Sequence, residues 1–195
     1  MNIVLYPHPA LRTKSVPVTK IDANLKRTVE EMFSLMYEAK GIGLAANQVG
    51  LPWRLFVINL TGDATKKEEE MVFLNPEIVK RSPATDEDEE GCLSIPDLYG
   101  PVTRSSKIIV DAFNLQGENF EVELDELAAR AVQHEYDHIE GVMFTDRMSE
   151  SNFRNVEGVL ERFEQEHKRA QAAGHLKSDE ELKAELKELA SKQGG

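Results

Sequence analysis

The chain is poor in cysteine: Cys92 is the single one among 195 residues, which excludes an internal disulfide framework. A lone thiol fits a reducing compartment and predicts a cytoplasmic location. No apolar run approaches the roughly 20 residues that a membrane-spanning helix needs. The first residues also lack the basic and apolar segments of a signal peptide. Together these absences predict a soluble protein without a membrane partner.

Positive charge is also scarce, with 23 lysines and arginines against 35 acidic residues and a formal net charge of −12. Such a chain repels phosphates, which argues against a sequence-specific nucleic-acid partner and against anionic membranes. The hydrophobic content of 41% is enough for a proper core. At this length we expect one domain with a terminal extension.

Sequence patterns predict short strands first and helices afterwards. A helix is expected from Asp22 to about Lys40, ended by Gly41, and residues 41–50 are expected to form a glycine- and alanine-rich loop. The acidic run 86–90 is expected to be a solvated loop. Strands are expected over residues 54–60, 71–74, 77–81, 107–114 and 119–124, the last two forming a hairpin. This order predicts an α+β fold in which antiparallel β-sheets pack around a central helix, with a C-terminal helical extension.

The chain changes character beyond residue 145. A long helix is expected to end near Gly174, and a capping box from Ser178 to Glu181 opens a second helix. The apolar stripe of the long helix consists of Phe153, Val156, Leu160 and Phe163. From residue 150 onward, 10 acidic residues stand against 8 basic ones, so this tail is charged but nearly balanced.

The most informative motif is 134–138, which reads His-Glu-Tyr-Asp-His inside a predicted helix capped by Asp125 and ended by Gly141. Residues four apart lie on the same helical face, so both histidines can bind one metal ion. Glu135 follows the first histidine, where a carboxylate can reach a water activated by that ion. The pattern indicates metal-assisted hydrolysis, and a surface helix with two solvated histidines is the alternative.

Cys92 is the candidate for a third ligand. A thiolate with two imidazoles gives three protein ligands and leaves a fourth position open, which is typical of a catalytic site. Taken alone, a single cysteine is more often a small buried hydrophobic residue than a ligand. The remaining histidines, His8, His167 and His175, lack a suitable spacing to this cluster.

The loop 41–50 reads Gly-Ile-Gly-Leu-Ala-Ala-Asn-Gln-Val-Gly and permits two interpretations. Its small residues either let a helix and a sheet approach closely, or leave room for the backbone of a substrate. In the second interpretation the amide of Gln48 donates a hydrogen bond to a developing oxyanion.

Three segments resemble, in this order, the signature motifs of bacterial peptide deformylases: Gly41–Gln48, Glu90–Ser94 and Gln133–His138. The resemblance spans residues 1 to about 165, which it implies to be the catalytic domain, and leaves 166–195 as a charged helical C-terminal extension. It implies a hydrolase that removes the formyl group from the N-terminal formylmethionine of newly synthesised polypeptides and releases formate.

The resemblance also implies a metal-binding central helix. By matching position, Cys92, His134 and His138 would bind one divalent metal ion. The family's metal is usually Fe²⁺, with Zn²⁺, Ni²⁺ or Co²⁺ as substitutes, and this choice rests on the resemblance alone.

The catalytic roles implied by matching position fall on three residues. Glu135 would act as general base and acid, while Gln48 and the backbone N–H of Leu93 would hold the oxyanion. Similar enzymes bind the peptide as an added strand, with the methionine side chain in an apolar pocket beside the metal. The substrate-binding positions implied here are Gly41, Ile42, Gly43, Leu93, Ala131 and Val132.

Several residues near these motifs stay open at this point. Arg130 and Tyr99 fall near pocket or rim positions, or belong to the surface. Asp137 orients a ligand histidine or faces solvent. Glu90 pairs with Arg104 or simply ends the acidic run. A ribosome contact is known for a basic terminal helix in some relatives, and for this nearly neutral tail it is expected on the resemblance alone.

Two other functions are compatible with the histidine motif. A metallopeptidase of the zincin type would take Glu157 or Glu161 as its third ligand and would leave Cys92 without a role. A non-catalytic, metal-stabilised binding module would hydrolyse nothing, although an open coordination position beside a glutamate is a poor design for a structural site.

Overall fold

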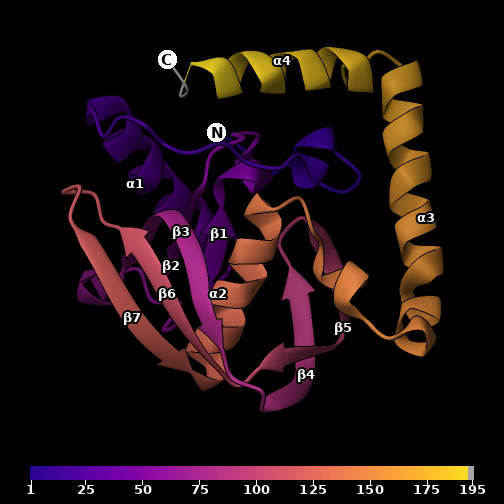
Figure 1. Ribbon diagram of the computed structural model, residues 1–195. Coiled ribbons are helices and arrows are strands. Elements are labelled where there is room, and N and C mark those ends of the chain that lie inside the picture. The colour runs from indigo at the N-terminus through magenta and orange to yellow at the C-terminus, as the bar shows by residue number, and fades with distance from the viewer. Residues whose placement is uncertain (193–195) are drawn as a thin grey trace.

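Figure 1 shows the computed structural model, in which a five-stranded sheet and a two-stranded sheet lie on either side of a central helix. The structure describes residues 1–192. The helices are α1 (Ala23–Glu38), α2 (Glu126–Ile139), α3 (Glu150–Ala172) and α4 (Asp179–Ser191). The strands are β1 (Gly43–Ala45), β2 (Leu55–Ile58), β3 (Met71–Arg81), β4 (Thr85–Cys92), β5 (Ile95–Ser105), β6 (Lys107–Phe113) and β7 (Asn119–Asp125). Short 3-10 turns are η1 (Pro9–Arg12), η2 (Ala46–Val49), η3 (Lys67–Glu69) and η4 (Phe144–Arg147).

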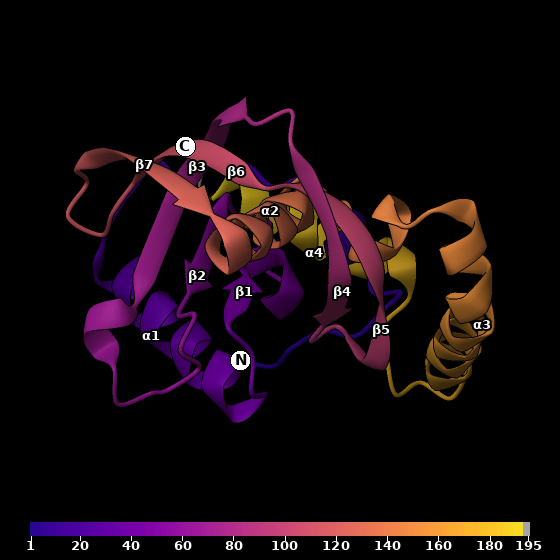
Figure 2. The ribbon, with the colours of Figure 1, turned by 90° about the horizontal axis from the view of Figure 1, so that it is seen from below.

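Both sheets are antiparallel, which confirms the predicted α+β fold. The larger sheet has the order β1-β2-β3-β6-β7, and the smaller one is the β4–β5 hairpin. Cys92 and Ile95 pair across the turn of this hairpin, so the cysteine ends β4 at the tip. Figure 2 shows α2 between the larger sheet and the hairpin.

The helices α1 and α2 cover opposite faces of the larger sheet, because successive side chains of a strand point to opposite sides. Leu55 and Val57 of β2 pack in one core cluster with the apolar stripe of α1. Phe56 and Ile58, the alternate residues, pack in a second cluster with α2. The central helix is therefore held by a fully buried strand.

The predicted first helix is confirmed, except for its last turn. The Asp22 carboxylate accepts a hydrogen bond from the N–H of Leu25 at 3.0 Å, which caps the helix. The residue that adopts the left-handed conformation after the helix is Lys40, with φ of 57°, and not Gly41. The N–H of Gly41 then donates to the carbonyl of Met36 at 2.8 Å and closes the turn.

Three loop and strand predictions were wrong. Residues 41–50 contain β1 and η2, because the small residues pair with β2 instead of remaining irregular. The strands 71–74 and 77–81 are one strand, β3, which passes Pro76 through a shift in register with Asn75 at φ of 50°. The acidic run 86–90 is β4, and only Glu90 of it is buried.

β5 had no clear signal in the sequence. Pro96, Gly100 and Pro101 interrupt the expected pattern, yet buried and exposed residues still alternate through much of the strand. Prolines are tolerated there because β5 has a single neighbour in its sheet, so missing N–H donors need not break a ladder.

The helices α3 and α4 enclose the N-terminal segment, with α4 lying across it at the top of Figure 1. As predicted, the stripe of α3 that includes Phe153, Val156 and Leu160 packs on the domain, where it meets Val4 and Tyr6. The division at residue 165 falls within α3 and stays a proposal, and residues 193–195 lie outside the described part. No helix within residues 1–192 is long and apolar enough to cross a membrane.

Candidate metal centre and active site

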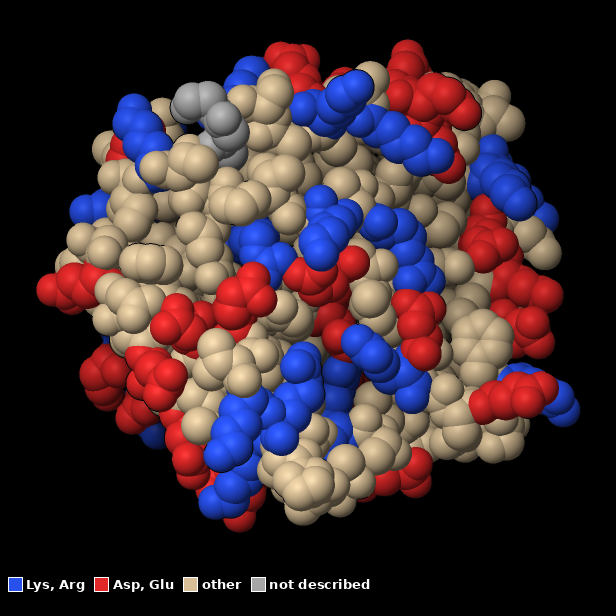
Figure 3. Space-filling view, viewed as in Figure 1, with Lys and Arg blue, Asp and Glu red and all other residues tan. Residues whose placement is uncertain are grey.

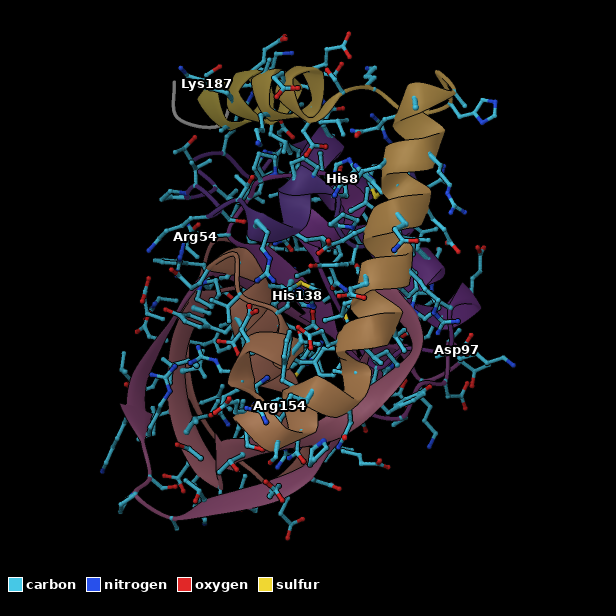
Figure 4. The ribbon with its side chains drawn as sticks, turned by 90° about the vertical axis from the view of Figure 1, so that its right-hand side faces the viewer. His8, Arg54, Asp97, His138, Arg154 and Lys187 are labelled. Carbon is cyan, nitrogen blue, oxygen red and sulfur yellow. The ribbon has the colours of Figure 1, made fainter. Side chains whose placement is uncertain are left out.

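Cys92, His134 and His138 meet at one point in the interior, where their ligand atoms all lie within 4.8 Å of one another. The Sγ atom of Cys92 is 3.3 Å from Nε2 of His138. Figure 4 shows His138 near the centre of the molecule, beside α3 in this view. Within residues 1–192 no other group of three such side chains comes together, and Glu157 and Glu161 are exposed on α3. The zincin-type third ligand is therefore not supported.

Local structure explains how these three ligands are brought together. Cys92 lies at the tip of the β4–β5 hairpin, while the two histidines are one turn apart on α2. The helix ends at Gly141, whose φ is 76°, and a Cβ there would lie 2.8 Å from the carbonyl oxygen of Arg12. Only glycine fits this helix end. The buried Asn47 of η2 donates from Nδ2 to the carbonyl of His138, which ties the end of α2 to η2.

Glu90 is the buried acceptor that orients one ligand. Its Oε2 is 2.9 Å from Nδ1 of His134 and accepts from Nη2 of Arg104 at 2.8 Å. Its Oε1 accepts from Nε of Arg104 at 2.9 Å and from Nη1 of Arg130 at 2.8 Å. A carboxylate on the second ring nitrogen fixes the orientation of a ligand histidine. The pairing of Glu90 with Arg104 is therefore confirmed.

Asp137 does not orient a histidine. It accepts hydrogen bonds from Arg104 and from Nη2 of Arg147, the latter at 2.7 Å. Arg104 thus bridges Asp137 and Glu90, and all three side chains are buried. This network fixes α2 against the hairpin at the level of the ligands.

Burial and neighbouring charges shift the pKa values of the site residues in different directions. Burial raises the pKa of Glu135 to about 7. Burial lowers the pKa of His138 well below its usual value. Burial alone would lower the pKa of His134, but hydrogen bonds with Cys92 and Glu90 outweigh it and raise that pKa to about 10. Burial opposes the charge on Glu90, yet hydrogen bonds with Arg104 and His134 hold its pKa well below the ordinary 4.5.

Gln48 lies against the same cluster, and its side chain is oriented by the backbone. The N–H of Ala45 donates to Oε1 of Gln48 at 2.9 Å, which leaves the amide NH₂ directed at the hairpin. That group is 3.4 Å from Sγ of Cys92 and 3.3 Å from Oγ of Ser94. A fixed amide donor beside the metal ligands can stabilise negative charge that develops there.

Glu135 is buried beside β1. A Cβ at Gly43 would lie 2.5 Å from Oε1 of Glu135, so a glycine is required for this approach. The other carboxylate oxygen, Oε2, has no hydrogen-bond partner among residues 1–192. A buried polar atom of this kind needs a water, an ion or a substrate group.

A cavity of about 570 Å³ opens onto Cys92, His134 and Glu135. Of the predicted substrate-binding residues, five line it: Gly41, Ile42, Gly43, Leu93 and Ala131. Val132 instead lies in the core, with 1% of its surface exposed. Tyr99, which is 63% exposed, and the buried Arg130 also line the cavity.

The residues of the site fit a divalent metal ion. A thiolate and two imidazoles are the ligand types that bind Zn²⁺ or Fe²⁺ with one position left open. The unpartnered oxygen of Glu135 lies on the residue next to His134, where an activated water would satisfy it. The cavity gives such a site access to a substrate.

Comparison with known proteins supports the same interpretation. A sequence profile described as polypeptide deformylase matches residues 1–154. A peptide deformylase of Rhodopirellula baltica is 46% identical over 182 residues, which cover 93% of this chain and 90% of the relative. The chain belongs to the polypeptide deformylase family.

Crystal structures of deformylases share the fold. Arabidopsis thaliana peptide deformylase 1B in complex with an inhibitor matches with a TM-score of 0.85 and 42% identity, covering 88% of this chain and 94% of that one. A Plasmodium falciparum peptide deformylase matches with a TM-score of 0.84 and 39% identity, covering 86% and 98%. As a deformylase, this chain is an enzyme, and its Cys92–His134–His138 group could hold a divalent metal ion.

Sequence reasoning missed two contacts that support this deformylase site, although it had placed Arg130 near the pocket. Asn47 holds the end of α2, and Arg130 is a buried ion-pair partner and not part of the surface. The spacing of Arg130 and His134, four residues apart on one helix, was the available signal for the second. No signal in the sequence pointed to the first.

Proposed function

We propose that this deformylase hydrolyses the N-formyl group of peptides that begin with formylmethionine, with water as the second reactant and formate as a product. The observation that carries the proposal is the meeting of three metal-ligand side chains, a buried unpartnered carboxylate and an open cavity. The metal ion, when bound, would supply Lewis-acid chemistry by lowering the pKa of a water and polarising the formyl oxygen.

The protein's own residues divide the remaining tasks. Glu135 takes a proton from the attacking water and later returns a proton to the leaving amine nitrogen. Its pKa, raised to about 7 by burial, suits both directions of transfer near neutral pH. The side-chain amide of Gln48 and the backbone N–H of Leu93 donate to the oxyanion. Cys92, His134 and His138 hold the ion, for which we propose Fe²⁺, with Zn²⁺, Ni²⁺ or Co²⁺ as substitutes.

The cavity is the proposed site for the peptide. Ile42, Leu93 and Ala131 supply apolar wall for the methionine side chain, while Gly41 and Gly43 leave room for the peptide backbone. Val132 would support this wall from the core. Apolar side chains in a cavity wall bind an uncharged thioether side chain because both lose contact with water.

Nascent polypeptides are the proposed substrates, which places the enzyme in the cytoplasm. A reduced Cys92 is required as a ligand, and this fits a reducing compartment. Contact with the ribosome stays a prediction. Figure 3 shows lysines, arginines and acidic residues interspersed along the α3 and α4 edges, without a uniformly basic face in this view.

The proposed function is tested by formate release under anaerobic conditions. Metal-loaded protein is incubated with formyl-Met-Ala, and with acetyl-Met-Ala as a control of the same length. We expect formate from the first peptide and little acetate from the second, because the extra methyl group must enter the space beside Gly43 and Glu135. Absence of formate release by metal-loaded protein would contradict the proposal, and cleavage of an internal peptide bond would favour a metallopeptidase.

A further inference from the structure

Arg130 lies on α2 one turn before His134, and both side chains reach the same carboxylate. Nη1 of Arg130 donates to Oε1 of Glu90 at 2.8 Å, while Nδ1 of His134 is 2.9 Å from Oε2. Residues four apart on a helix share one face, so the two side chains approach Glu90 side by side. Glu90 therefore connects an arginine and a metal ligand that belong to one helix.

Both terminal nitrogens of the Arg130 guanidinium donate further hydrogen bonds. Nη1 also donates to the carbonyl of Val102 at 2.8 Å, and Nη2 donates to the carbonyl and the carboxylate of Asp86 at 3.1 and 2.7 Å. Arg130 thus joins α2 to both strands of the hairpin that carries Cys92. The Arg130 side chain is 9% exposed, and its pair with the buried Glu90 is shielded from solvent, whereas Asp86 is 53% exposed.

The same side chain is part of the cavity wall. Arg130 lines the cavity together with Leu127, Ala131 and His134 of the same helix. Glu90, Asp86 and a backbone carbonyl bind its guanidinium, and these contacts hold the aliphatic part of the side chain along the cavity wall. One residue thereby contacts both the orienting carboxylate and the space proposed for the substrate.

We propose that Arg130 is a positioning and specificity-determining residue: its guanidinium holds Glu90 in the orientation that fixes His134, and its side-chain stem shapes the methionine cavity. The first role acts on metal affinity and the second on substrate KM. The second role rests on the proposed function, whereas the first needs only the metal site.

Two substitutions separate these roles. Arg130→Met keeps an unbranched stem but removes the guanidinium, so Glu90 loses one of its two arginine partners. We expect the Zn²⁺ dissociation constant to rise about 10- to 100-fold, as for loss of other groups that orient ligands. At saturating metal, the KM for formyl-Met-Ala is expected to stay close to that of the unmodified protein. Arg130→Ala removes the stem as well, and we expect the same loss of Zn²⁺ affinity together with a higher KM.

Arg54→Met is the matched control. Arg54 is as buried as Arg130 and also forks between two carboxylates, Glu77 and Glu140, but it does not contact Glu90. Its loss should lower the melting temperature without weakening Zn²⁺ binding. Equal weakening of Zn²⁺ binding in this control would overturn the positioning role, since any lost buried arginine would then suffice.

The measurement is a Zn²⁺ titration of the metal-free full-length protein against a chromophoric chelator, followed by steady-state kinetics. The titration needs no substrate, so a failed formate assay leaves it valid. Unchanged Zn²⁺ affinity in Arg130→Met would overturn the positioning role. Equal KM values in Arg130→Met and Arg130→Ala would overturn the role in shaping the methionine cavity. If Arg130→Met does not fold, Arg130→Lys is used: it keeps a cation that cannot bridge Glu90 and Asp86 together, and Zn²⁺ affinity equal to the unmodified protein's would overturn the role.

Discussion

The region around α2 and the C-terminal arm of α3 and α4 use charge in opposite ways. Beside α2, Glu90, Arg104 and Asp137 form ion pairs whose side chains are 5–6% exposed. On the arm, the pairs of Arg154 with Glu150 and of Lys192 with Glu188 are exposed and join residues four apart on one helix. Figure 4 shows Arg154 near the lower end of α3, away from His138. Buried pairs are costly to break and fix geometry, whereas exposed pairs contribute little.

The difference explains why sequence reasoning predicted the arm from local patterns but missed most of the contacts that support the site beside α2. The arm follows from local patterns, namely an apolar stripe and the capping box at Ser178, and both are confirmed. The metal site depends on pairing between distant segments. Glu90 belongs to an acidic run whose sequence resembles a solvated loop. It is buried because it pairs with side chains of α2 and β5.

The largest expected effect concerns catalysis beside α2. Glu135→Gln removes the group proposed to move protons, so we expect kcat/KM for formyl-Met-Ala to fall by about 10²–10⁴-fold. Metal content should stay unchanged, because Glu135 is not among the grouped ligands. Formate release and elemental analysis on the same sample provide the check. Turnover like that of the unmodified protein would end the general-base assignment.

Gln48→Ala is expected to have the next largest effect. Its loss removes a fixed donor proposed for the oxyanion, and such losses reduce kcat by about 10²–10³-fold. Because Gln48 donates to the transition state more than to the substrate, KM should change little. The control is Gln171→Ala on α3, which lies outside the cavity. A raised KM with normal kcat would contradict the oxyanion role.

Stability tests the comparison of buried and exposed charge directly. Asp137→Asn leaves Arg104 without one of its two buried carboxylate partners, and we expect a loss of about 3–5 kcal/mol in the free energy of unfolding. Glu150→Gln on α3 breaks an exposed pair and should leave the melting temperature unchanged. Denaturant titration of both proteins measures the contrast. Equal losses would show that burial of the pairs has no consequence.

The smallest expected effect is a pH dependence of the arm. His8 lies against α3 and α4, where His167, Asp179 and Glu185 face it. Burial, followed by the charge of His167, lowers the pKa of His8 below the ordinary 6.5. Below pH 6.5 the unfolded chain therefore binds more protons than the folded one, and stability falls until the folded-state pKa is reached.

His8→Gln is expected to flatten this decline, and hydrogen exchange along α4 between pH 7 and pH 5 provides the measurement. After correction for the intrinsic exchange rate at each pH, protection of the α4 amides should fall on acidification in the unmodified protein and fall less in the variant. Identical pH profiles in the two proteins would remove His8 from this role.

The fold was predictable wherever one segment carried its own signal. The hairpin of β6 and β7, the N-cap of α1 at Asp22 and the end of α2 at Gly141 all follow from local residue chemistry. β5 was not predictable, because Pro96 and Pro101 are residues that usually argue against a strand. They are tolerated here since β5 has a single neighbouring strand in its sheet. At the site, the motifs predicted which three candidate ligand side chains would come together, while the groups that support them come from contacts between segments far apart in sequence.

The central claim is that Cys92, His134 and His138 bind one metal ion. Titration of the anaerobic, metal-free protein with Co²⁺, followed by absorption, tests it directly. We predict saturation at a single equivalent, a thiolate-to-cobalt charge-transfer band in the near ultraviolet and visible bands of a four-coordinate ion, with the charge-transfer band lost in Cys92→Ser. Binding of Co²⁺ without a thiolate band, or an unchanged band in Cys92→Ser, would contradict the claim.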